Sequence, residues 1–238
     1  LAAWQSDIEI VEGDLRDSAA VGKVVAGIDR VFHLAAFISV PQSMKDPQTC
    51  YDINVSGTIH LLEACRREGV GKVVLASSTA VYGDTDVFPT TEATPLCPLS
   101  PYALSKQVNE LYSVLYTHIF HMPVIALRFF NVYGPRQYSD SPYAAAIPIF
   151  VNLLVSGQPI TVFGDGKQSR DFIYVRDVVN ANLQAADSQA EGEVFNICSG
   201  RETTLLDLIE ELDEIFPRHP KARFEEPRPG DIYRSLGS

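Results

Sequence analysis

Short apolar runs alternate with longer amphipathic stretches along the first half of the chain. The runs VFHLAA, VVLAS and VIALRFF, and the earlier segment IEIVEG, have the length and branched side chains of β-strands. Helical spacing predicts a short helix around 19–26, a long one from about 48 to 68, and a third after Ser100. Strands that are apolar throughout suit a parallel sheet covered on both faces. We therefore expect a doubly wound, Rossmann-type α/β sheet with ligands at the carboxyl ends of its strands.

The character of the chain changes after Asn131. Two loops rich in Gly, Pro and charge, NVYGPRQYSD and FGDGKQSRDF, are followed by helical patterns from about 143 to 155, from 175 and from 204. These patterns predict a smaller lobe interwoven with the sheet. We expect residues 1–141 to form the sheet domain and 142–238 mainly the lobe, with the segment around 171–197 returning to the sheet domain.

A serine at a strand end and a Tyr-x-x-x-Lys pair at a helix start carry the candidate chemistry. Ser100 and Pro101 suit the N-cap and the first helical position. Positions i and i+4 share a helix face, so Lys106 can approach the Tyr102 phenol and lower its pKa. Such a tyrosine exchanges a proton with an alcohol oxygen, to which Ser78 offers a second hydrogen bond. The pattern indicates alcohol–ketone interconversion beside a hydride carrier, whereas the alternative is an ordinary amphipathic pair.

The rest of the same helix has a regular apolar pattern. Helical spacing predicts a buried stripe formed by Leu104, Val108, Leu111, Leu115 and Ile119. Tyr102 and Lys106 are expected at the rim of that stripe.

Composition narrows the class of protein. The 238 residues carry a net charge of −11, which argues against a nucleic-acid partner. No apolar run reaches the roughly 20 residues of a membrane span. Cys50, Cys65, Cys97 and Cys198 lack the spacing of a zinc site or a disulfide framework, so we expect no metal and reduced thiols in the cytoplasm. His33 is expected to pack at its strand end rather than to act in catalysis.

Seven motifs stand in a recognisable order: GDLRD, HLAA, SSTAVYG, SPYALSK, RFFNVYGPRQ, GDGKQSRDFIYV and RPGD. Their order resembles the extended short-chain dehydrogenase/reductase family and, within it, the nucleotide-sugar 4-epimerases. The resemblance implies a bound NAD and a UDP-sugar that is oxidised at its carbon 4 and then reduced from the opposite face. It also implies that the sheet domain binds NAD and that the lobe binds the nucleotide-sugar.

The resemblance assigns roles residue by residue. It implies catalytic roles for Ser78, Tyr102 and Lys106, with Tyr102 as the base. For NAD it implies Asp14, Leu15, Leu34, Ala35, Ala36, Asn54, Tyr102, Lys106 and Phe129. For the substrate it implies Ser39, Ser78, Thr79, Asn131, Ile147, Val162, Arg170, Arg228, Asp231 and Ser235. The planar fork of arginine suits phosphate oxygens. Arg170 could instead form a local ion pair, Arg228 could be a solvated loop charge, and Asp14 could only close a turn.

Details within the motifs select among members of the family. Family members that dehydrate carry Asp-Glu where this chain has Thr79 and Ala80, and related UDP-glucuronate decarboxylases carry a glutamate there, so both activities are disfavoured. Ser235 stands where a small residue leaves room for a 2-N-acetyl group, and SVPQSMKDP, beginning at Ser39, resembles the UDP-N-acetylglucosamine 4-epimerase branch. UDP-GlcNAc/UDP-GalNAc is therefore the expected substrate pair. A plain hexose or a uronate stays open, since Ser235 could be a simple loop serine.

One family motif is missing. The sequence contains no G-x-x-G-x-x-G turn, which in the family receives the pyrophosphate at a helix N-terminus. We therefore expect a sheet that lacks its first βαβ unit, with an exposed edge and an apolar patch, and weakened NAD binding. A catalytically silent chain that binds UDP-sugars weakly is the alternative of another class. By analogy with the family, the full-length protein is expected to form a homodimer through the two long helices.

Overall fold

A four-stranded parallel sheet forms the centre of the protein. The computed structural model describes residues 7–137, 145–216, 221–227 and 232–238. The strand order is β1 (Arg30–His33), β2 (Lys72–Ser78), β3 (Val124–Phe129) and β8 (Val194–Ile197). All three pairings are parallel, with Ser78 beside Phe129 where β2 and β3 end. The predicted α/β fold with a parallel sheet is confirmed.

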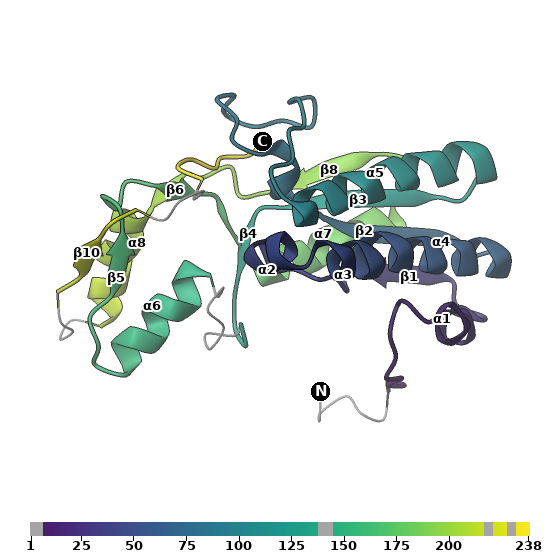
Figure 1. Ribbon diagram of the computed structural model, residues 1–238, viewed down its shortest axis with the longest axis horizontal. Coiled ribbons are helices and arrows are strands. Elements are labelled where there is room, and N and C mark those ends of the chain that lie inside the picture. Colours follow the sequence, from purple (N-terminus) through teal and green to yellow (C-terminus); the bar gives the residue numbers. More distant parts are fainter. Residues whose placement is uncertain (1–6, 138–144, 217–220, 228–231) are drawn as a thin grey trace.

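The side chains of the central strands alternate between two cores. Val73, Leu75, Val124 and Ala126 pack on one face with α1 (Ser18–Val25), α4 (Gly57–Glu68) and α5 (Pro101–Phe120). Val74, Ile125 and Leu127 pack on the other face with α7 (Val175–Asp187). Figure 1 shows α4 and α5 on one side of the sheet and α7 behind it. Both faces are covered, which explains why these strands are apolar throughout.

The long helix expected at about 48–68 is divided. It consists of α3 (Pro47–Tyr51), a π-helical segment η2 (Asp52–Ser56) and α4, and it follows the short helix α2 (Val40–Lys45). Asp46 caps α3 by accepting a hydrogen bond from the Thr49 amide at 3.0 Å. The π-helical segment places Asn54 in the interior, at 2% exposure. Such segments occur frequently at functional sites.

Two sequence-based expectations are wrong. The apolar stripe of α5 faces outward: Leu104, Leu111, Leu115 and Ile119 are 47–63% exposed, and Val108 is half-buried. The buried face of α5 is instead formed by small and polar residues, because it packs closely on the sheet and on η2. The segment IEIVEG is not a strand either, since no described strand lies beside it to complete a hydrogen-bonded ladder.

A smaller lobe is built around a second core. Strands β5 (Thr161–Phe163) and β10 (Arg223–Glu225) pair in parallel beside α6 (Ala146–Val155) and α8 (Leu205–Ile215). Phe150, Leu154, Ile160, Val162 and Leu212 form its buried centre. The lobe lies at the left of Figure 1, away from the main sheet.

Short strand pairs connect the two parts. Strand β4 (Asn131–Tyr133) pairs with β7 (Phe172–Tyr174), and β6 (Ser169–Arg170) pairs with β9 (Thr203–Thr204). After the first pair, α7 and β8 return to the main sheet. The division at residues 141 and 142 stays a prediction. In the described part of the chain, no helix has the length and apolar character needed to cross a membrane.

Candidate active site

Ser78, Tyr102 and Lys106 come together where β2 ends and α5 begins. The Ser78 side chain lies close enough to the Tyr102 phenol to lower its pKa. The Lys106 ammonium lies 5.9 Å from the centre of the Tyr102 ring and donates a 2.8 Å hydrogen bond to the carbonyl of Ala76. Lys106 is only 4% exposed. The structure therefore assembles the three predicted catalytic residues in one place.

The protonation behaviour of this group differs from the expectation for Tyr102. Burial raises the Tyr102 pKa above 10, although the nearby Ser78 side chain lowers it. The expectation that Lys106 would bring the Tyr102 pKa towards neutrality is therefore wrong for this structure, because desolvation outweighs the favourable contacts. Burial also lowers the Lys106 pKa to about 8, against the charges of Cys50 and Glu110. Lys106 thus titrates in the range in which acid–base catalysts operate.

Local hydrogen bonds fix the start of α5. The Ser100 hydroxyl caps the helix by accepting from the Ala103 amide at 3.1 Å. The Tyr102 amide donates to the Ser43 hydroxyl of α2 at 3.2 Å. Ser105 donates to the Tyr102 carbonyl at 2.7 Å. The backbone of Tyr102 is therefore held by α2 as well as by its own helix.

Asn54 shapes the loop that follows β1. Its Oδ1 accepts from the Phe37 amide at 2.7 Å, and its Nδ2 donates to the Phe37 carbonyl and to the Ser105 hydroxyl. The side chain predicted to contact NAD is thus fully engaged with the protein. It fixes the chain beside Ala36 and ties it to α5.

An apolar cavity of about 460 Å³ opens beside Tyr102 and Lys106. Leu34, Ala36 and Phe129, which were predicted for NAD, line it together with Tyr102 and Lys106. A smaller cavity of about 230 Å³ is lined by the other three predicted residues, Asp14, Leu15 and Ala35. The predicted cofactor residues other than Asn54 therefore line two cavities near the strand ends.

Asp14 closes the turn before α1. Its carboxylate accepts from the Arg16 side chain and amide, and these bonds lower the Asp14 pKa to about 2. Asp14 therefore closes a turn, as the alternative interpretation of this residue expected. The carboxylate is nevertheless exposed at the rim of the smaller cavity, so the turn and a cofactor contact are compatible.

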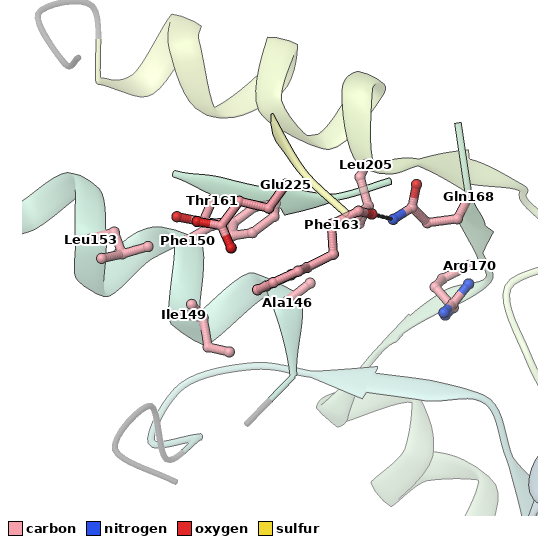
Figure 2. A pocket seen from close by; sticks show the side chains of 10 residues that line it. All are labelled: Ala146, Ile149, Phe150, Leu153, Thr161, Phe163, Gln168, Arg170, Leu205 and Glu225. Carbon is pink, nitrogen blue, oxygen red and sulfur yellow. Dashed lines mark hydrogen bonds between the residues drawn. The ribbon is translucent and has the colours of Figure 1, made fainter. Parts of the chain in front are cut away.

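The lobe contains a separate cavity of about 490 Å³. Figure 2 shows Arg170 and Gln168 at one end of it and Glu225 and Thr161 towards the other, where apolar side chains of α6 also lie. The Arg170 guanidinium donates to the Ser169 carbonyl at 2.8 Å. The cavity therefore combines a cationic end with an apolar wall.

The neighbours of two predicted residues, rather than the residues themselves, line this cavity. Val162 is fully buried in the core of the lobe, and alternation along β5 turns Thr161 and Phe163 towards the cavity. Ile147 is half-buried on α6, whereas Ala146 and Ile149 line the cavity. Strand alternation and helical spacing could have identified this lining from the sequence. The proposed substrate roles of Ile147 and Val162 stay predictions.

The remaining substrate residues are distributed over several elements. Ser39 caps α2 by accepting from the Gln42 amide at 3.2 Å. Thr79 begins the 3-10 helix η3 (Thr79–Tyr82), directly after Ser78. Asn131 begins β4, and its backbone N–H donates to the Asp171 carbonyl at 3.0 Å. Ser235 is half-buried. Arg228 and Asp231 lie outside the described residues.

Ser235 lies in a segment that is held on both sides. Arg234 forms a bidentate ion pair with Glu202, with both distances 2.8 Å. The Gly237 amide donates to the buried Asp171 carboxylate at 3.2 Å. The position of Ser235 is therefore fixed by contacts distant in sequence.

His33 packs as expected. It is buried at the end of β1, and its Nε2 lies 2.8 Å from the Thr58 hydroxyl. Burial, assisted by the Lys106 charge, lowers the His33 pKa to about 4. The imidazole is neutral at physiological pH and belongs to the framework of the site.

Comparison with known proteins identifies the family. Residues 2–198 match the model of the NAD dependent epimerase/dehydratase family. The chain belongs to that family. UDP-glucose 4-epimerase of Mycolicibacterium smegmatis is 38% identical over 237 residues, which cover 98% of this chain and 75% of that protein.

Solved structures agree with this assignment. UDP-N-acetylglucosamine 4-epimerase of Methanobrevibacter ruminantium, solved with UDP-N-acetylmuramic acid, matches with a TM-score of 0.93 and 38% identity, over 96% of this chain and 73% of that one. UDP-glucose 4-epimerase of Thermus thermophilus, solved with NAD, matches with a TM-score of 0.86 and 35% identity, over 95% of this chain and 75% of that one. The predicted family, the enzyme class and NAD as its cofactor are confirmed.

Proposed function

We propose that this protein catalyses NAD-dependent 4-epimerisation of a UDP-sugar through a 4-keto intermediate. The observation that carries the proposal is the convergence of Ser78, Tyr102 and the buried Lys106 at the carboxyl ends of the parallel strands. An enzyme of this family that interconverts an alcohol and a ketone needs a group that takes and returns one proton. Tyr102 meets that need at the wall of the larger apolar cavity.

The residues present fit the cofactor on two sides. Leu34, Ala36 and Phe129 provide an apolar wall beside Lys106, whose ammonium is suited to hydrogen-bond ribose hydroxyls. NAD, when bound, supplies the hydride acceptor and donor. Tyr102 would take the proton of the sugar's 4-hydroxyl as a phenolate, a form that its raised pKa disfavours in the structure described, and Ser78 would hold the same oxygen through a hydrogen bond. Lys106 is buried beside the exchange, whereas Tyr102 is half-buried at the cavity wall.

Epimerisation also requires the sugar to turn over while the nucleotide stays bound. The cavity of the lobe supports this requirement, because Arg170 supplies a cation for phosphate at one end and apolar side chains of α6 line part of the remainder. Binding energy from the nucleotide would then serve the reacting carbon. Arg228 is proposed as a second phosphate contact, and Asp231 as a contact to the ribose.

UDP-GlcNAc/UDP-GalNAc is the substrate pair that we propose. Ser235 has a small side chain in a segment fixed through Arg234 and Gly237, which favours a pocket of constant size with room for a 2-N-acetyl group. Ser39 accepts a helix-capping bond and still has its hydroxyl proton to donate to a sugar. Thr79 and Ala80 provide no acid or base for dehydration. UDP-glucose and UDP-glucuronate are the competing substrates.

A direct assay tests the function. The purified chain is mixed with NAD and UDP-GlcNAc, and formation of UDP-GalNAc is followed; UDP-glucose and UDP-glucuronate are offered separately. We expect Tyr102→Phe to abolish turnover, whereas Tyr112→Phe on the same helix should retain it. Full activity of Tyr102→Phe would refute the mechanism. Binding of UDP-sugar without any turnover would favour the silent binding module.

We also propose that α5 packs against a second copy of the protein. Its outward stripe of Leu104, Leu111, Leu115 and Ile119 is a continuous apolar surface on a helix that otherwise covers the sheet. We expect sedimentation velocity to show a dimer in the parent and a monomer for Leu111→Glu, with no change for Val87→Glu in an exposed loop. A Leu111→Glu variant that remained dimeric would refute this interface.

Cytoplasmic location is proposed as well. The four cysteines are free, as expected for a reducing compartment. Fractionation of the source cells would test this location.

A further inference from the structure

A buried carboxylate lies one helical turn beyond Lys106 on α5. Glu110 pairs with Arg128 of β3 through two hydrogen bonds, Nε to Oε1 at 2.9 Å and Nη2 to Oε2 at 2.8 Å. Both side chains are only 5% exposed. The Ser77 hydroxyl donates to the same carboxylate. One carboxylate therefore joins the helix of Tyr102 and Lys106 to the strand end that carries Ser78.

Arg128 also contacts the segment that follows Ser78 in the sequence. Its Nη1 donates to the Tyr82 phenol at 2.7 Å, and the guanidinium lies 4.8 Å from the centre of the same ring. Tyr82 ends η3 and donates to Asn196 of β8 at 2.7 Å. Residues on both sides of Ser78 are thus attached to the Glu110–Arg128 pair.

Stability alone does not account for such a pair. Buried ion pairs can often be replaced by apolar residues of similar volume without loss of stability. The location of this pair is what distinguishes it, since Ser77 adjoins Ser78 and Glu110 follows Lys106 on the same helix face. Lys106 is faced by Glu110, by Cys50 from α3, by His33 from β1 and by the Tyr102 ring. Of these groups, Glu110 supplies the full negative charge.

We propose that Glu110, held by Arg128, is a positioning residue that fixes Ser78 against Tyr102 and holds the Lys106 ammonium in place for proton transfer. The proposal rests on the proposed epimerase function for its kinetic test. Supporting residues of this kind typically change activity by about 10- to 100-fold when they are altered.

Matched variants separate positioning from general stability. We expect Glu110→Gln to lower kcat by about tenfold or more with the KM for the UDP-sugar nearly unchanged. Glu63→Gln is the control, because Glu63 also ties α5 to its surroundings, but through Tyr116 at the far end of the helix. Equal kcat values for Glu110→Gln and Glu63→Gln would overturn the proposal.

A serine series provides a second comparison in case Glu110→Gln does not fold. Ser77→Ala removes the bond to Glu110 and should lower kcat, and Ser77→Thr should recover it because the hydroxyl is retained. Ser113→Ala removes another buried serine of the region, one that bonds only its own helix, and should have no effect on kcat. A Ser77→Ala variant as active as Ser113→Ala would contradict the proposal.

A titration that needs no turnover distinguishes failure of this proposal from failure of the proposed function. The ε-carbon signals of ¹³C-labelled lysine are followed against pH, and Lys106→Met assigns the Lys106 signal. We expect the midpoint for Lys106 to fall in Glu110→Gln and to stay unchanged in Glu63→Gln. If the parent chain is inactive, the proposed function fails and a lowered midpoint still supports the role of Glu110. An unmoved midpoint overturns that role whatever the turnover.

Discussion

Replacing Lys106 with methionine should stabilise the protein at neutral pH while removing its activity. Burial lowers the Lys106 pKa from 10.5 to about 8, and each unit corresponds to about 1.36 kcal/mol. The buried charge therefore costs about 3 kcal/mol relative to the neutral amine. Losing the 2.8 Å hydrogen bond to the Ala76 carbonyl offsets about 1 kcal/mol of that gain. We expect the Lys106→Met variant to be more stable by about 2 kcal/mol at pH 7.

The pH dependence gives this prediction a definite sign. Between pH 8 and 10.5 the unfolded chain binds more protons at Lys106 than the folded protein, so the parent gains stability as pH rises. The Lys106→Met variant has no titrating group at this position, so it lacks this gain. Its advantage should shrink from about pH 8 upward and reverse by about 1 kcal/mol near pH 10.5, where only the lost hydrogen bond remains.

Urea unfolding at pH 7 and at intervals to pH 10.5 measures the difference between parent and variant. Other groups that titrate in this range cancel in that difference. Lys23→Met, at an exposed position in the last turn of α1, is the control and should change the free energy of unfolding by less than about 0.5 kcal/mol at every pH. A Lys106→Met variant that is less stable at pH 7, or whose advantage does not change with pH, would refute the reasoning.

Two further predictions concern the framework around the site. The His33 pKa is lowered from 6.5 to about 4, so the protein should lose up to about 3 kcal/mol of stability as pH falls through that window, because the unfolded chain binds the proton first. Urea unfolding should show this loss in the parent and in a His118→Asn control, and a much smaller one in His33→Asn; equal losses in all three would exclude His33 as the cause. Gly83 has a φ of +65°, and an added Cβ would lie 2.0 Å from the Cys97 carbonyl oxygen. Gly83→Ala should therefore cost at least about 2 kcal/mol in thermal unfolding, whereas Gly27→Ala, at φ +73° with open space around it, should cost about 1 kcal/mol; equal costs would mean that the contact with Cys97 is relieved.

Local sequence patterns predicted the elements of the sheet well. The strands at 30–33, 72–78 and 124–129 and the helices after Ser100, Tyr174 and Thr204 form where periodicity indicated them, and Ser100 caps its helix as predicted. These signals act over a few residues, through backbone geometry and the alternation of apolar side chains. They therefore predict an element correctly where its neighbours in the fold complete it.

The two wrong predictions concern segments whose structure depends on the element that packs against them. The stripe of Leu111 and Leu115 has the spacing of a core face, but spacing does not say which surface will cover it. The small and polar residues of α5, such as Ser105 and Asn109, are buried because close approach of η2 and the sheet supplies their hydrogen bonds. The segment at 8–13 has strand composition, yet a strand forms only where another strand completes its ladder.

The sequence by itself determined which residues are proposed to carry the chemistry: a serine at a strand end, and a tyrosine and a lysine one helical turn apart on a capped helix. Only the tertiary structure decided how those groups behave. Burial raises the Tyr102 pKa and lowers that of Lys106, and Arg128, which is 18 residues from Glu110 in sequence, turns that glutamate into a support of the site. Desolvation and pairing between distant residues depend on how elements pack together, and no local pattern records that packing.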